Sequence, residues 1–202
     1  MLLFSQTATF KNNLFKRIVM ASTPDKEFSY ELRIPKERVA VLIGKKGETK
    51  RGIEHETKTK LTINSQEGDI KIVGEDALLL YLCREIIRAI GRGFNPDIAR
   101  QLLKSDYAIE FISITDFARN PNDLERLRGR VIGEGGKSRR TIEELSQVTI
   151  CVYGKTIGII GPADYIVDAR KAVENLLTGS SHALVYKILE KKRRERRFSN
   201  SI

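Results

Sequence analysis

Two long stretches of the chain carry the same succession of apolar patterns. Residues 27–34 and 107–114 alternate apolar with polar side chains, which is the pattern of a half-buried strand. Two helical patterns, two more strand patterns and a long helical pattern follow in each stretch. The order β-α-α-β-β-α is therefore predicted twice. The expected strands are residues 27–34, 59–63, 70–74, 107–114, 148–152 and 157–161, and the expected helices are residues 37–43, 77–90, 122–132 and 163–177, with one more helix in each stretch that ends near residues 57 and 146.

Breaker residues divide the chain between and after these stretches. The junction Gly-Arg-Gly-Phe-Asn-Pro at residues 91–96 ends the first stretch, and Gly-Ser-Ser at 179–181 ends the second. A short connecting helix is expected at 97–104 and a last helix from about His182 to Arg197. The predicted division is an N-terminal extension at residues 1–25, in which Met20 is an alternative start, a first domain at 26–93, a linker helix at 94–104, a second domain at 105–179, and a basic C-terminal helix and tail at 180–202.

The strongest internal similarity lies between the first two helices of each stretch. The first copy reads V-L-I-G-K-K-G-E-T-K-R-G-I-E at residues 41–54, and the second reads R-V-I-G-E-G-G-K-S-R-R-T-I-E at residues 130–143. In both copies an apolar pair precedes G-x-x-G, and two cations, a spacer, Ile and Glu close the motif. One G-x-x-G can arise by chance, but two with matched flanks indicate a duplicated unit.

The composition of the glycine loop suits a phosphate ligand. Glycine has no Cβ, so the backbone of the loop can approach a ligand closely. The helix that follows presents unpaired N–H groups and the positive end of its dipole at Gly47 or Gly136. In the first copy, Lys45 and Lys46 add positive charge to the loop. The motif therefore predicts that a polyanionic strand lies against each loop.

These residues resemble the KH family in its type I arrangement, whose signature is an apolar pair, G-x-x-G and an apolar-studded helix. The resemblance covers residues ~26–93 and ~105–178 and implies an α+β fold of two tandem KH domains. Each domain would be a three-stranded antiparallel sheet backed by three helices, with single-stranded RNA in a groove beside the loop. The candidate groove floor is Leu42, Ile43, Leu61 and Ile63 in the first copy and Val131, Ile132, Ile150 and Val152 in the second. The candidate RNA-binding residues are Gly44, Lys45, Lys46, Gly47, Lys50, Arg51, Leu61, Ile63, Arg130, Gly133, Gly135, Gly136, Lys137, Ser138, Arg139, Arg140, Ile150 and Val152.

Two departures from the usual KH pattern narrow the resemblance. The second loop holds Glu134, which repels phosphate, beside the permissive Gly135. Three positions after each loop, Lys50 and Arg139 stand where KH helices normally carry an apolar residue. With G-x-G-G-K-[ST]-[KR]-x-T-I-E in the second copy, the chain is similar to the archaeal Dim-two family, equivalent to the eukaryotic partner-of-Nob-one. This resemblance implies small-subunit ribosome assembly in the cytoplasm, binding near the 3′ end of small-subunit ribosomal RNA, and two protein partners, the endonuclease Nob-one and the alpha subunit of initiation factor two.

Composition and charge agree with a nucleic-acid partner. In 202 residues, 36 Lys+Arg against 26 Asp+Glu give a net charge of +10, which favours a polyanion. No stretch approaches the ~20 apolar residues that cross a bilayer, so no membrane association is expected. Cys83 and Cys151 lie far apart, and with two histidines they offer no metal-ligand spacing. We therefore expect no metal or cofactor, and a reducing compartment.

Other functions can be weighed against RNA binding. No enzyme and no small-molecule substrate are expected, because Gly136-Lys137-Ser138 resembles the end of a phosphate-binding loop but Val131 stands where its first glycine is required. His55 has no matched Ser, Cys or paired acid. A protein-docking scaffold stays open, above all for the copy with Glu134, as does single-stranded DNA binding. We also hypothesise that the basic terminal helix tracks adjoining RNA or contacts another assembly factor.

Overall fold

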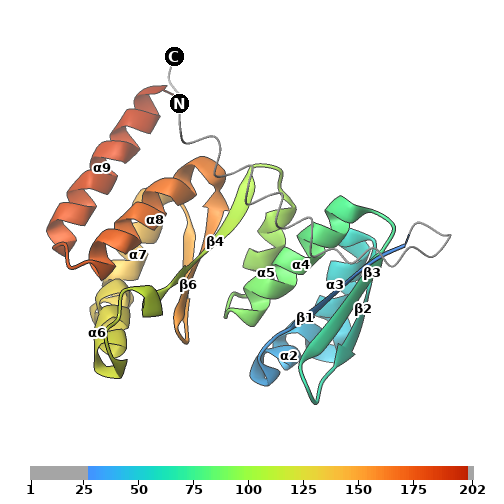
Figure 1. Ribbon diagram of the computed structural model, residues 1–202. Coiled ribbons are helices and arrows are strands. Elements are labelled where there is room, and N and C mark those ends of the chain that lie inside the picture. The colour runs from blue at the N-terminus through green and yellow to red at the C-terminus, as the bar shows by residue number, and fades with distance from the viewer. Residues whose placement is uncertain (1–26, 200–202) are drawn as a thin grey trace, which may run out of the picture. The chain divides into compact units, whose positions relative to one another are not determined.

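The computed structural model describes residues 27–199, and the extension predicted at residues 1–25, Met20 included, lies outside them. The chain divides between Gly91 and Arg92 into two compact units (Figure 1). We call the part up to Gly91 unit 1 and the part from Arg92 unit 2. Each unit has its own three-stranded antiparallel sheet, and the predicted α+β class is confirmed.

Unit 1 follows the predicted order β-α-α-β-β-α. Its sheet has the strand order β1-β3-β2, so the two outer strands both pair with β3. Ile70 and Ile72 of β3 are buried on the face that the helices cover, and Leu61 of β2 stands opposite Ile72. The elements are β1 (Phe28–Arg33), α2 (Lys36–Ile43), η1 (Lys45–Gly47), α3 (Glu48–Thr57), β2 (Thr59–Asn64), β3 (Asp69–Gly74) and α4 (Ala77–Gly91).

Unit 2 repeats this order and adds helices at both of its ends. Its sheet has the equivalent strand order β4-β6-β5. The short helices α5 and η2 come before the sheet, and the long helix α9 packs on α7 and α8 after it. The elements are α5 (Pro96–Ala99), η2 (Arg100–Leu103), β4 (Tyr107–Ser113), η3 (Ile114–Asp116), α6 (Pro121–Ile132), η4 (Glu134–Gly136), α7 (Lys137–Ser146), β5 (Thr149–Tyr153), β6 (Thr156–Pro162), α8 (Ala163–Leu177) and α9 (His182–Ser199).

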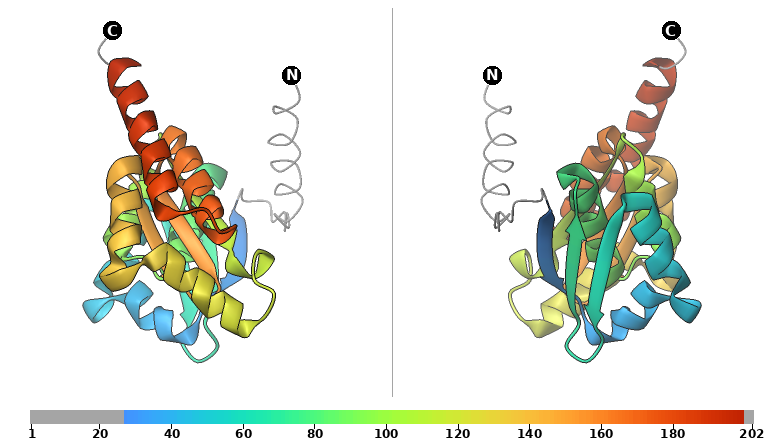
Figure 2. Two further views of the ribbon diagram at one scale, coloured as in Figure 1. Left: turned by 90° about the vertical axis from the view of Figure 1, so that its left-hand side faces the viewer. Right: turned by 90° about the vertical axis from the view of Figure 1, so that its right-hand side faces the viewer.

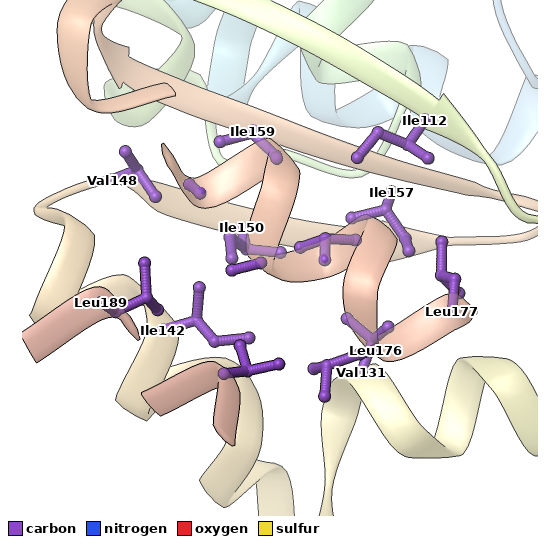
Figure 3. Packing of buried hydrophobic residues seen from close by; sticks show 14 of the residues in the cluster. Ile112, Val131, Ile142, Val148, Ile150, Ile157, Ile159, Leu176, Leu177 and Leu189 are labelled. Atoms are coloured by element: carbon purple, nitrogen blue, oxygen red, sulfur yellow. The ribbon is translucent and has the colours of Figure 1, made fainter. Parts of the chain in front are cut away.

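The main core of unit 2 lies between its sheet and its helices. Side chains from the strands, from α6 to α8 and from the start of α9 meet there (Figure 3). Val131 comes from α6, Ile142 from α7 and Leu189 from α9, and none of the three is more than 1% exposed. The end of α6 and the start of α7, which flank the second glycine loop, are therefore anchored in a packed core.

The sheet of unit 2 is also covered on its other face. Gly158 and Ile160 of β6 alternate with Ile157 and Ile159, and all four are buried. Phe94 packs so closely over Gly158 that a Cβ there would lie 2.5 Å from its ring. The segment predicted as a linker, residues 94–104, thus forms α5 and η2, and η2 lies against β4 and β6. The near-continuous apolar run of β6 follows from burial on both faces.

In unit 1, the face of the sheet that the helices do not cover is polar. Glu31, Lys71 and Thr62 stand side by side across β1, β3 and β2, and all three are exposed. The two copies therefore share a helix-covered face but differ on the other one.

The start of α6 is capped by Asn120. The Asn120 side chain accepts a hydrogen bond from the backbone N–H of Asp123 at 2.8 Å, and Pro121 occupies the first turn. In return, Asp123 accepts from the backbone N–H of Arg119 at 3.1 Å and from the Arg126 side chain. These hydrogen bonds, that of Arg119 foremost, hold the pKa of Asp123 below its ordinary value.

Candidate nucleic-acid interface

The two glycine loops adopt the same backbone conformation although their sequences differ. In unit 1, Gly44, Lys46 and Gly47 have φ angles of 73°, 51° and 79°. The corresponding angles in unit 2, at Gly133, Gly135 and Gly136, are 73°, 55° and 80°. Each loop is one short turn that leads directly into the next helix, α3 or α7. The repeat found in the sequence is therefore a repeat of backbone geometry.

The first glycine of each loop is required by packing as well as by its φ angle. A Cβ on Gly133 would lie 2.6 Å from the backbone nitrogen of Ser138, and one on Gly44 would overlap the side chain of Thr49. Ser138 is 3% exposed, so it supports the loop from behind and has little surface for a ligand. Thr49 and Ser138 thus hold equivalent places under the two loops.

The middle of each loop is open to solvent. Lys45, Lys46, Glu134 and Gly135 are exposed, and a Cβ added to Gly135 would meet no atom within 4 Å. Lys46 has the left-handed conformation that costs a residue with a Cβ ~1–2 kcal/mol, whereas Gly135 adopts it without strain. Unit 1 therefore keeps a positive charge at a conformational cost, which is typical of functional positions.

The two cations that follow each loop point to different places. Arg140 turns back to the loop and donates to the carbonyl of Gly135 at 2.7 Å. Arg51 takes the same place in unit 1, where its guanidinium lies 3.2 Å from the position of a Cβ on Gly47. With the exposed Lys137, these cations keep positive charge beside the loop, although the second loop itself carries Glu134.

Arg139 turns instead to the outer strand β5, and Lys50 pairs with Glu54, which contacts the outer strand β2. Glu143 accepts a hydrogen bond from the backbone N–H of Ile150 at 2.7 Å, and Arg139 donates to the carbonyl of the same residue at 3.2 Å. In unit 1, Glu54 likewise accepts from the N–H of Leu61 at 2.7 Å. The cation and carboxylate of each pair lie within ion-pair distance, 3.6 Å for Arg139 with Glu143 and 3.8 Å for Lys50 with Glu54. A charged pair thus occupies the edge of β2 and of β5.

This contact explains the cation that stands where KH helices normally carry an apolar residue. The sequence analysis missed the role of Glu54 and Glu143, although both copies carry the cation and the glutamate four positions apart. That spacing puts the cation and the glutamate on one face of a helix. Its occurrence in both copies was the signal from which the pairing could have been predicted.

The candidate groove floor separates into core and surface residues. Leu42, Leu61, Val131 and Ile150 are at most 2% exposed and belong to the core. The other four candidates keep part of their surface in solvent and so have area to offer a base: Ile43, Ile63, Ile132 and Val152. The core residues therefore support the floor that their neighbours form.

Arg130 is directed away from the loop. Its guanidinium donates to the carbonyls of Leu176, at 3.1 Å, and Ser180, at 2.7 Å. His182 donates in turn to the carbonyl of Arg130 at 2.9 Å. These bonds fix the start of α9 to the end of α6. Of the candidate binding residues, Arg130 is thus the one that the structure separates most clearly from the loop.

Other chemistry in the described part of the chain is sparse. Within residues 27–199, no group of three or more His, Cys, Asp or Glu side chains could hold a metal ion. The helices of the same range include none long and apolar enough to cross a membrane. Cys83 is fully buried, and this burial raises the pKa of its thiol.

Comparisons with known proteins agree with this geometry. Residues 29–89 match the KH domain family. Residues 108–194 match the second KH domain of PNO1, described as a eukaryotic-type KH domain (KH domain type I). The chain is 49% identical to a KH domain-containing protein of Methanocaldococcus jannaschii over 81% of this chain and 74% of that protein. It is 32% identical to the RNA-binding protein PNO1 of Oryzias latipes over 63% of this chain and 54% of that protein.

Two solved structures extend the likeness to three dimensions. The crystal structure of Dim2p from Pyrococcus horikoshii matches with a TM-score of 0.76 and 46% identity, over 81% of this chain and 98% of that chain. A chain in the a/eIF2alpha-aDim2p-rRNA complex of the same organism matches with a TM-score of 0.79 and 44% identity, over 84% of this chain and 96% of that chain. With two KH domains and these relatives, the chain belongs to the family of tandem type I KH-domain proteins that includes archaeal Dim2p and eukaryotic PNO1.

Proposed function

We propose that this chain binds single-stranded RNA through its two glycine loops and acts in assembly of the small ribosomal subunit. The main support is that the two exposed loops share one backbone conformation with positive φ angles. Each loop leads into a helix, and cations lie beside it. The names of the relatives support the proposal, since one is an RNA-binding protein and one structure is a complex with rRNA.

Each unit would hold the phosphates and the bases on different surfaces. The phosphates lie along the loop, where Lys45 and Lys46 in unit 1 and Arg140 and Lys137 in unit 2 supply charge. The bases lie over the partly exposed floor residues, such as Ile63 and its counterpart Val152. The edge groups of Leu61 and Ile150 are occupied by the glutamates, so we infer that this backbone edge contributes little to base reading.

The finer features of the proposal rest on the family resemblance. We place the bound RNA near the 3′ end of small-subunit ribosomal RNA, with a role in its maturation in the cytoplasm. The alpha subunit of initiation factor two is a proposed partner because a/eIF2alpha stands in the complex with the P. horikoshii relative. The endonuclease Nob-one is a further proposed partner, and it rests on the family resemblance alone.

The first test reverses charge in one loop at a time. Fluorescence anisotropy with a labelled RNA from the 3′ region of small-subunit ribosomal RNA measures affinity for Lys45→Asp with Lys46→Asp, and for Glu134→Asp with Gly135→Asp. Lys60→Asp with Lys71→Asp is the matched control, because both lysines are exposed on the outer face of the unit 1 sheet. We expect the first pair to weaken binding ~10-fold and to lower the salt slope by about 0.7 for each lost phosphate contact.

The outcomes separate the candidate functions. With native circular dichroism, unchanged affinity in both loop variants rules out the loops as the RNA site. A loss confined to the first pair leaves unit 2 as a protein-docking KH domain, which Glu134 favours. The affinity for single-stranded DNA of the same sequence is measured last. Equal affinity for DNA and RNA would exclude recognition of the 2′-OH and favour the DNA-binding alternative.

A further inference from the structure

Helix α9 has apolar side chains on two sides. Val185 and Leu189 are 1% exposed and pack into the core of unit 2. Leu184, Ile188 and Phe198 are 51%, 44% and 73% exposed on the outer side of the same helix. In the left view of Figure 2, α9 (red) lies in front of the other helices of unit 2. An apolar side chain left in solvent at three places on one helix face is unusual unless the face is covered by a partner.

The outer side forms a continuous seam. Leu184, Ile188, Lys191, Glu195 and Phe198 follow one another at steps of 4, 3, 4 and 3 residues. This is the average period of 3.5 by which one helix packs along another. At 1.5 Å per residue the seam is ~20 Å long, or about four turns. With Lys187 and Arg194 these residues line a shallow groove of about 520 Å³. We call these seven residues the α9 seam.

The cations of α9 belong to two different faces. Arg196 stacks on the ring of Tyr165 at 4.4 Å and lies 3.4 Å from Asp168. Arg193 reaches toward Glu144 at 3.9 Å. These two arginines hold the second half of α9 against α7 and α8. The basic run seen in the sequence is therefore not one cationic surface.

The remaining charge gives the α9 seam its character. Lys187, Lys191 and Arg194 flank the apolar side chains, and Glu195 is the carboxylate among the seven seam residues. The ion pairs here are exposed, at 3.9 Å for Lys191 with Glu195, 3.7 Å for Arg194 with Glu190 and 3.2 Å for Lys192, outside the seam, with Glu195; exposed pairs of this kind contribute little. The seam thus has apolar side chains toward both ends, Lys191 and Glu195 between them, and a net positive charge.

We propose that the α9 seam docks a partner protein through an amphipathic helix whose apolar stripe is bordered by Asp and Glu. Carboxylates on such a helix complement Lys187, Lys191 and Arg194, while its apolar stripe covers Leu184, Ile188 and Phe198. RNA fits less well, because the aliphatic side chains of Leu184 and Ile188 neither pair with phosphate nor stack on bases as aromatic rings do. A second copy of this chain fits less well too, because the cations of the two seams would face each other.

This surface is separate from the glycine loops, so the inference goes beyond the RNA-binding proposal. The match to the second KH domain of PNO1 runs to residue 194 and includes most of α9, whereas the match in unit 1 ends at residue 89, within α4. Helix α9 is therefore part of the domain shared by the family and not an appendage of this chain.

The test uses the full chain and a synthetic peptide. The probe is a fluorescein-labelled helical peptide of ~18 residues with leucines at the heptad seam and glutamates beside them, and a scrambled peptide is its control. The seam variant is Leu184→Gln with Ile188→Gln and Phe198→Gln, because glutamine keeps helix propensity. The control variant is Ala183→Gln, an exposed position of α9 outside the seam. A third variant carries Lys187→Glu, Lys191→Glu and Arg194→Glu.

We expect the native chain to bind the acidic peptide and the seam variant to bind it at least ~10-fold more weakly, with Ala183→Gln unchanged. The charge-reversed variant should instead prefer a peptide with lysines in place of the glutamates. Equal affinity of the native chain for the scrambled peptide, or of the seam variant for the acidic one, overturns the proposal. Weaker RNA binding by the seam variant also overturns the proposal, because it would make RNA the occupant of the seam. The proposal fails as well if the native chain self-associates in sedimentation and the seam variant does not. Because RNA affinity is measured on the seam variant as well, failure of the seam proposal can be told apart from failure of the RNA-binding proposal.

Discussion

Replacing Lys46 by glycine should stabilise unit 1 and at the same time weaken RNA binding. Lys46 has a φ of 51°, a conformation that disfavours a residue with a Cβ by ~1–2 kcal/mol. Glycine removes this penalty but adds ~0.5–1 kcal/mol of chain entropy to the unfolded state. From the middle of each range, the net gain for Lys46→Gly is ~0.5–1 kcal/mol. With a typical urea m-value of ~2 kcal/mol per molar, the midpoint should rise by ~0.3–0.5 M.

The assay must report on unit 1 alone. The chain has no tryptophan, and its two cysteines fall in different units, Cys83 in unit 1 and Cys151 in unit 2. Cys83 is fully buried, so brief thiol labelling in rising urea followed by mass spectrometry measures the unfolding of unit 1. RNA affinity is measured on the same samples by anisotropy over a range of salt. The expected loss of one phosphate contact lowers the slope by about 0.7.

Lys46→Ala separates the two effects. Alanine removes the charge but keeps the Cβ, so it should weaken RNA binding as glycine does without a gain in stability. If glycine and alanine give the same urea midpoint, the strain assigned to Lys46 is absent. If Lys46→Gly binds RNA as tightly as the native chain, this lysine does not meet a phosphate.

Two further predictions concern the edge of β5 and the buried thiol. Glu143→Ala leaves the N–H of Ile150 without its acceptor and should lower the free energy of unfolding by ~1–3 kcal/mol, measured by thermal unfolding. Glu143→Gln keeps an acceptor oxygen and should lower it by less. Equal melting temperatures of the native chain and both variants would contradict the role of this hydrogen bond. In native conditions at neutral pH, Cys83 should react with iodoacetamide far more slowly than Cys151, since burial raises the pKa of Cys83 and blocks access, and equal rates would contradict its burial.

Most of the fold could be predicted from local sequence patterns. The alternating strands and the two glycine loops depend on residues within a few positions of one another, and the structure confirms the strands and the short turns at the loops. The observed ends differ from the expected ones by small amounts, as where Val148 is buried just before β5 begins at Thr149. Such shifts are ordinary at element ends, where pairing between strands decides the boundary.

Contacts between distant elements could not be read from the pattern. The hydrogen bond from Ile150 to Glu143 depends on how close α7 lies to β5, and the inward turn of Arg196 depends on Tyr165 in α8. The packing of residues 94–104 on the unit 2 sheet had a signal, because an apolar run without alternation, such as Ile157 to Ile160, is typical of a strand buried on both faces.

The charged pairs on β2 and β5 also bear on how this chain behaves beside other chains. An outer strand exposes a row of N–H and C=O groups on which a foreign strand can add, and this is a common route to aggregation. Glu54 and Glu143 each occupy one donor of that row, at Leu61 and Ile150, so an incoming strand would have to break a charged hydrogen bond before its ladder could form. Among nascent polypeptides and exposed protein tails, this would keep both sheets from growing.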